Sequence, residues 1–184
     1  MDARAIRRPN RRVVSIMSGG NPNHDPKNGE FTTGVGLSAA HKAHTNAAVK
    51  AVLSNIETSW TGEVEISFLF CDDEKIRDLN DIWNDKDYAT NVLSFPAAPN
   101  KIKTPVTLLG DVILAFETIS KEALEQDKTI SSHAAHMLVH GVLHLFGYDH
   151  LNDIDADRME SVETRVLHTM GIADPWVSID SSRS

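Results

Sequence analysis

Five histidines recur in one largely apolar segment, HAAHMLVHGVLHLFGYDH, which runs from His133 to His150. Apolar residues on nearly all sides of this segment indicate a helix in the centre of the fold. His140 and His144 are four residues apart, so on a helix their side chains share one face. Glycine adopts a positive φ without steric cost, so Gly147 allows the chain to leave the helix sharply. We expect this turn to bring His150 back to the other two imidazoles.

Three neutral imidazoles around one open position describe a catalytic zinc site. The spacing H-x-x-x-H-x-x-G-x-x-H is also that of the metzincin peptidases, in which a glutamate after the first histidine is the general base. Gly141 occupies that position here. The sequence therefore predicts one Zn²⁺ ion bound by His140, His144 and His150, without the base of a peptidase.

Three neighbouring residues have weaker assignments. His136 shares the helix face of the ligand pair and is expected to support a ligand or to line the groove. His133 is about two turns from His140, too far to share its metal, and is expected at the surface. Asp149 precedes the third ligand and is expected to orient an imidazole, as carboxylates often do in zinc sites. The sequence identifies no general base.

Periodicity along the rest of the chain predicts a single α+β domain with about five helices. The predicted helices cover residues 38–56, 72–83, 118–126, 131–146 and 153–170, and the predicted strands cover residues 63–71, 91–97 and 108–116. Asp72 is expected to cap the second helix and Ser131 or Ser132 the fourth, and the fifth is expected to open at Asp153 or Asp155.

The two ends of the chain are predicted to lie outside this domain. Residues 1–36 carry five arginines among the first twelve residues and continue into a stretch rich in Gly, Asn, Pro and Ser. This composition is typical of a disordered arm. The domain is expected to cover residues 37–174, and residues 175–184 form a polar tail.

Composition narrows the function class further. The 184 residues carry a net charge of −8, which argues against a protein that coats nucleic acid by bulk electrostatics. The single cysteine excludes an intramolecular disulfide and fits the cytoplasm. No apolar run approaches the roughly 20 residues that a membrane-spanning helix needs, so no membrane partner is expected.

Three blocks of the sequence resemble the YbeY family. HGVLHLFGYDH closely resembles the family's signature. Two further stretches resemble the family's second and third blocks, namely LNDIWNDKDYATNVLSFP (Leu79–Pro96) and LLGDVILAFETISKEALEQ (Leu108–Gln126). Met159 and Glu163 fit the helix that follows the signature. The resemblance covers about Val49 to Gly171, which is most of the predicted domain.

This resemblance implies a zinc-dependent endoribonuclease with a small mixed β-sheet packed with helices around the metal. It implies single-stranded and ribosomal RNA as substrates, roles in ribosomal RNA maturation and ribosome quality control, and contact with the ribosome or small-subunit proteins. The family usually has an arginine near the metal cleft where this chain has Asn84, and Lys86 is the nearest cation in sequence. Lys86, Lys101 and Lys103 are candidates for holding RNA, although solvated lysine is the commoner role.

Two alternatives remain open from the sequence. One is a zincin-like metallopeptidase, which the histidine spacing suggests and Gly141 opposes. The other is a non-catalytic ribosome-assembly factor in which zinc is structural, which Asn84 favours because asparagine supplies no cation to a scissile phosphate.

Overall fold

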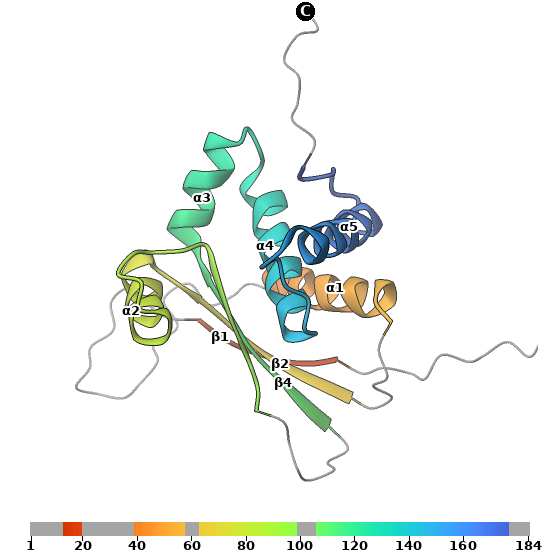
Figure 1. Cartoon of the computed structure of the whole chain (residues 1–184), viewed down its shortest axis with the longest axis horizontal. Coiled ribbons are helices and arrows are strands. Elements are labelled where there is room, and N and C mark those ends of the chain that lie inside the picture. The colour runs from red at the N-terminus through yellow and green to blue at the C-terminus, as the bar shows by residue number, and fades with distance from the viewer. Residues whose placement is uncertain (1–12, 20–38, 58–62, 99–105, 177–184) are drawn as a thin grey trace, which may run out of the picture.

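The computed structural model describes residues 13–19, 39–57, 63–98 and 106–176. These residues form one four-stranded sheet and five helices (Figure 1). The strands are β1 (Val13–Gly19), β2 (Glu63–Cys71), β3 (Val92–Pro96) and β4 (Val106–Ala115); the helices are α1 (Ala39–Asn55), α2 (Asp73–Asn84), α3 (Phe116–Glu125), α4 (Ile130–Leu145) and α5 (Asp153–Thr169).

The sheet is mixed, as predicted. Its strand order is β1-β2-β4-β3, in which β2 pairs in parallel with both β1 and β4, and β3 pairs antiparallel to β4. β3 is therefore an edge strand among the described residues. Its residues from Val92 to Pro96 lie opposite Leu114 to Gly110, and this edge also forms one wall of the candidate site described below.

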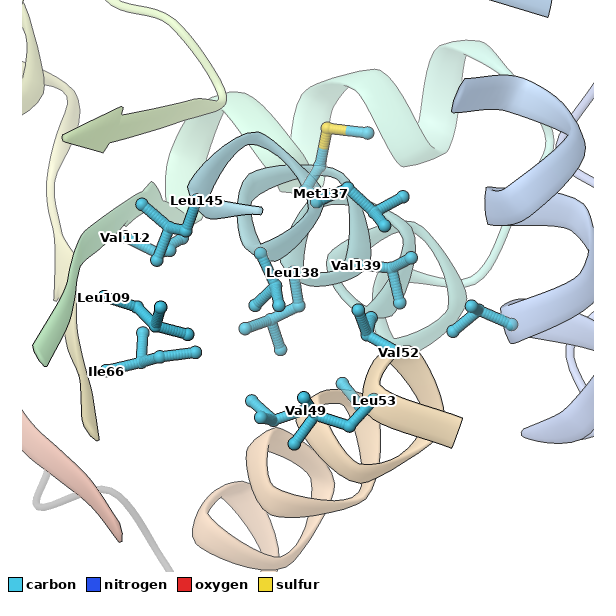
Figure 2. Close-up of a cluster of buried hydrophobic side chains, with 14 of the residues drawn as sticks. Val49, Val52, Leu53, Ile66, Leu109, Val112, Met137, Leu138, Val139 and Leu145 are labelled. Carbon is cyan, nitrogen blue, oxygen red and sulfur yellow. The ribbon is translucent and has the colours of Figure 1, made fainter. Parts of the chain in front are cut away.

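α4 is the central helix of the fold. It contacts β3, β4, α1, α3 and α5, and ten of its sixteen residues are buried. Figure 2 shows Leu138 and Val139 of α4 above Val49 and Val52 of α1, with Ile66 of β2 beside them. The nearly continuous apolar surface of α4, which the sequence indicates, thus has a neighbour on most sides.

A smaller apolar cluster covers the other face of the sheet. Side chains alternate between the two faces of a strand, so Phe68 of β2 joins the main core while Cys71 faces α2. There Ile76 of α2 packs with Cys71 and Leu93 of β3. Burial raises the pKa of the Cys71 thiol to about 12, with the nearby Asp72 charge adding to the shift, so this cysteine is an unreactive thiol.

The helix starts agree with the sequence for α2 and α5 and differ for α4. Asp72 caps α2, and its side chain accepts the Lys75 N–H at 2.9 Å. The predicted cap of α4 is wrong, whereas α5 begins at Asp153 as expected. Thr129 caps α4, so Ser132 lies in the first turn, and Asn152 caps α5 by accepting the Asp155 N–H. Hydroxyl, amide and carboxylate side chains are nearly equivalent N-caps, so the sequence alone does not decide which of several neighbouring residues caps a helix.

The prediction of a disordered arm over residues 1–36 is wrong for β1. Val13–Gly19 pairs in parallel with β2, from Val13 opposite Val64 to Gly19 opposite Phe70. VVSIM has strand propensity, but its pairing partner is some fifty residues away, so local composition outweighed it. The other residues of the arm, Lys101, Lys103 and residues 177–184 lie outside the described residues.

Two residues assigned to the tail pack against the domain. The backbone oxygen of Pro175 accepts the Lys128 side chain at 3.0 Å, and the Trp176 ring lies 5.5 Å from the His136 ring. Within the described ranges, none of the helices combines the length and the hydropathy that a bilayer crossing requires.

We predict that Phe68→Ala destabilises the protein by about 3–5 kcal/mol, because Phe68 is fully buried and its removal leaves a cavity in the main core. Leu108→Ala is the matched control, since Leu108 lies on the neighbouring strand β4 and is 51% exposed. Its effect should stay within about 0.5 kcal/mol. Urea denaturation of both variants measures the difference, and equal losses would contradict this assignment of the core.

Candidate metal centre

The end of α4 brings three histidines together. His140 and His144 lie on one face of the helix, which Gly147 ends with a φ of 82°. The Tyr148 N–H returns to the Leu143 carbonyl at 3.1 Å, which closes the turn. His150 follows, and its ring centroid lies 5.4 Å from that of His140 and 5.2 Å from that of His144. One ligand atom from each ring lies within 4.8 Å of the other two.

Hydrogen bonds fix how two of these rings present their nitrogens. The Nδ1–H of His140 donates to Glu163 Oε1 at 2.7 Å, and the Nδ1–H of His144 donates to the Tyr148 carbonyl at 2.9 Å. Carboxylate and carbonyl oxygens only accept, so each Nδ1 carries a proton, and in the neutral form that binds metal each ring presents an Nε2 lone pair.

The two lone pairs face each other. Nε2 of His140 lies 3.0 Å from Nε2 of His144. Two ligands of a tetrahedral zinc are about 3.3 Å apart for Zn–N bonds of about 2.0–2.1 Å. This donor set, three imidazoles of which two have their other nitrogen bonded to an acceptor, fits a divalent transition metal.

The surroundings of His144 favour its neutral form. Burial lowers the pKa of His144, and the neighbouring His140 and His150 lower it further. Neutral imidazole is the form that binds metal, so this environment favours ligation over protonation.

Glu163 is the functional residue that spacing alone did not identify. It lies on α5 and is 1% exposed, and its two oxygens accept from His136 Nε2 at 3.2 Å and from His140 Nδ1. Burial by itself would raise its pKa, but these two hydrogen bonds outweigh burial and lower the pKa of Glu163 to about 2. It is therefore an anion that orients a candidate ligand. A sequence signal exists: Glu163 interrupts the apolar face that Met159 and Val166 define on α5, and a charge there requires a buried partner.

A cavity of about 520 Å³ opens beside the three imidazoles. Its walls come from the β3 edge and the segment before it, from α4 and from the turn after α4. Asp149 is the single carboxylate among its lining residues in the described part of the chain, and none of these residues is a lysine or arginine. The lining residues are Thr90, Asn91, Val92, Leu93, Ser94, Pro96, His140, His144, Gly147, Tyr148, Asp149 and His150.

Of the other candidate residues, His136 and Asp149 lie near the three imidazoles, and Asn84 and Lys86 do not line the cavity. His136 is buried and reaches the ligand set through Glu163. Asp149 lines the cavity, but its Oδ1 accepts the backbone N–H of His150 rather than an imidazole N–H. Asn84 and Lys86 are exposed near the end of α2 and do not line the cavity; the Asn84 amide donates to Asn80.

The expectation that His133 lies at the surface is wrong. It is 3% exposed, and its Nε2 lies 2.7 Å from Glu122 Oε2. Glu122 also accepts the Asn91 amide, so this carboxylate joins α3, α4 and the segment before β3. The physical reason is that α3 packs on α4 and covers its first turns. The sequence of α4 alone does not indicate which helix covers this face.

Gly141 permits the close approach of α4 to the sheet. A Cβ at this position would lie 2.7 Å from Val112 Cγ1 and 3.0 Å from Ser94 Oγ. The Ser94 hydroxyl donates to the Gly141 carbonyl at 3.0 Å, which fixes β3 against the helix. The position that holds the general base in metzincins therefore has no room for a side chain.

We predict that Glu163→Gln weakens metal binding by about 10- to 100-fold. Glutamine offers one oxygen where two imidazole N–H groups need acceptors, so one ring loses its partner. Glu160→Gln, on the same helix, is the matched control and should bind metal as the wild type does. Competition with a chromogenic zinc chelator measures both affinities. Wild-type affinity in Glu163→Gln would show that the carboxylate does not support the site.

The comparisons with known proteins agree on one family. The family model of endoribonuclease YbeY matches residues 35–171. The chain is 54% identical over 114 residues to the endoribonuclease YbeY of Agrobacterium fabrum, a match that covers 61% of this chain and 68% of that protein. It is 50% identical over 113 residues to the endoribonuclease YbeY of Sinorhizobium fredii, where the match covers 61% of this chain and 65% of the relative.

A solved structure supports the same fold. The solution structure of the Thermotoga maritima protein TM1509 superimposes with a TM-score of 0.51 at 17% sequence identity, over 92% of this chain and 100% of that one. This similarity concerns the fold alone. The region that the family model matches contains β2, β3, β4, all five described helices and the three converging histidines, and it leaves out β1. On these grounds the chain belongs to the endoribonuclease YbeY family.

Proposed function

We propose that this protein is a zinc-dependent endoribonuclease that cleaves single-stranded RNA in the cytoplasm, in ribosomal RNA maturation and ribosome quality control. Its partners would be ribosomal RNA and the ribosome or its small-subunit proteins. One observation carries the proposal: His140 and His144 present their Nε2 atoms to one point beside His150, at the wall of an open cavity. The relatives named endoribonuclease YbeY support RNA as the substrate class.

The donor set favours zinc as the ion. Three imidazole nitrogens with one remaining position suit a tetrahedral zinc, whereas magnesium and calcium prefer oxygen ligands. When bound, zinc supplies Lewis-acid polarisation of a phosphoryl oxygen and lowers the pKa of a bound water.

The protein's own residues position the ion and admit the substrate. Glu163 and the Tyr148 carbonyl hold the two helical imidazoles in the tautomer that leaves Nε2 free. Among its described lining residues the cavity carries one carboxylate, Asp149, although the chain as a whole has a net charge of −8. A phosphodiester therefore meets little local repulsion, and the polar residues Thr90, Asn91 and Ser94 are among the residues that line the cavity.

The peptidase alternative loses support at Gly141. A glutamate there would need the space that Val112 and Ser94 occupy. The general base of a metzincin has no counterpart at this position, which leaves the histidine spacing as the alternative's remaining argument.

We predict chelator-sensitive cleavage of unstructured RNA, without cleavage of unstructured peptides. His144→Ala should lose more than about 100-fold in rate, because it removes one of the ligands that the metal needs to act. The measurement incubates purified wild type and variant with each substrate, with and without chelator, and returns zinc after chelation. Peptide cleavage without RNA cleavage would reverse the order of the two functions.

We predict that metal loss changes the melting temperature only slightly, since the core around α4 is apolar and complete without the ion. His150→Ala is the informative variant, because His150 is exposed on the turn and its ring forms no hydrogen bond to another described residue. It should melt close to the wild type and lose RNA cleavage. Unfolding of this variant at ordinary temperature would instead indicate a structural metal, as the assembly-factor alternative requires.

A further inference from the structure

The described residues of the metal cavity offer no cation to a phosphate. Its lining residues within the described ranges include neither lysine nor arginine, and Asn84 and Lys86 lie outside it. A phosphodiester group is an anion that guanidinium groups bind well through charged hydrogen bonds. A cation that contacts a residue of the cavity wall would supply this interaction.

Arg158 of α5 is in that position. Its Cζ lies 5.0 Å from the centroid of the Tyr148 ring, within the range of a cation–π contact. Tyr148 lines the cavity, and its backbone oxygen accepts the Nδ1–H of the candidate ligand His144. The tyrosine also packs against the main core, so it supports the guanidinium on a fixed surface.

The Arg158 guanidinium is available to an anion. The side chain is exposed, and across the described ranges it forms no ion pair or hydrogen bond. The acid one turn before it, Asp155, is engaged by Asn152 through both its backbone N–H and its side chain. By contrast, Arg77 on α2 is already paired with Asp87 at 2.6 Å.

We propose that Arg158 is a phosphate-binding residue at the rim of the metal cavity, and that it contacts the backbone of single-stranded RNA beside the scissile phosphodiester. The proposal rests on the proposed function, because it assumes RNA as the substrate. The contact recognises phosphate and not a base, so it contributes affinity independent of RNA sequence.

The test compares zinc-loaded wild type with Arg158→Ala, Arg158→Lys and Arg165→Ala. Arg165 is the matched control, because it is an exposed arginine two turns further along α5 and donates to Ser161. Steady-state cleavage of an unstructured RNA at several salt concentrations gives KM and kcat. Fluorescence anisotropy with the same RNA and the same proteins gives the dissociation constant.

Arg158→Ala should raise KM and the dissociation constant about tenfold, as expected for one charged hydrogen bond, with kcat changed less than about twofold. Its slope of log affinity against log salt should be shallower by about 0.7, the value for one lost phosphate contact on a single strand. Arg158→Lys should restore the salt slope and part of the affinity. Arg165→Ala should match the wild type.

Three results overturn the proposal. These are wild-type affinity and salt slope in Arg158→Ala, equal losses in Arg158→Ala and Arg165→Ala, or a loss confined to kcat. A wild type that binds the RNA without cleaving it contradicts the proposed function, and the anisotropy series then still decides the role of Arg158. A wild type that neither cleaves nor binds the RNA contradicts both.

Discussion

The carboxylate of Glu163 joins two helices and one side of the candidate metal site. It is almost completely buried on α5, and it accepts from two imidazoles of α4, His136 and His140. A buried anion is tolerated only when its oxygens are bonded, so the two helices must keep their relative position. The tautomer of His140 depends on the same hydrogen bond. The packing of α5 on α4 therefore also determines the direction of the His140 Nε2 lone pair.

The second candidate ligand on α4 is held in another way. His144 donates to the carbonyl of Tyr148, in the turn that Gly147 begins. The same turn carries His150 to the cavity, so the backbone path that delivers the third imidazole also orients the second. Two separate acceptors thus orient the two imidazoles of α4 toward the same point. One is Glu163 on α5, and the other is the Tyr148 carbonyl in the turn that follows α4.

Much of this arrangement follows from local sequence, and the remainder depends on contacts between distant segments. The i, i+4 spacing of His140 and His144 and the glycine after them determine the convergence because they lie within one helical turn and its end. Glu163 was identified only through a family resemblance, without a role, since its partners are more than twenty residues away. His133 was misplaced for the same reason: its burial is decided by α3, not by its own helix. β1 was missed because its short apolar run is recognisable as a strand only once β2 lies beside it.

The bare Cα of Gly141 also has a geometric consequence for the cavity. At this residue the helix that carries two imidazoles lies close to Val112 of β4 and to Ser94 of β3. The approach of α4 to the β3 edge, both of which line the cavity, therefore depends on the absence of a side chain at Gly141. A side chain at this position would force Val112, Ser94 or Val92 to shift, and because Ser94 and Val92 line the cavity, such a shift would reshape the cavity wall without replacing a candidate ligand.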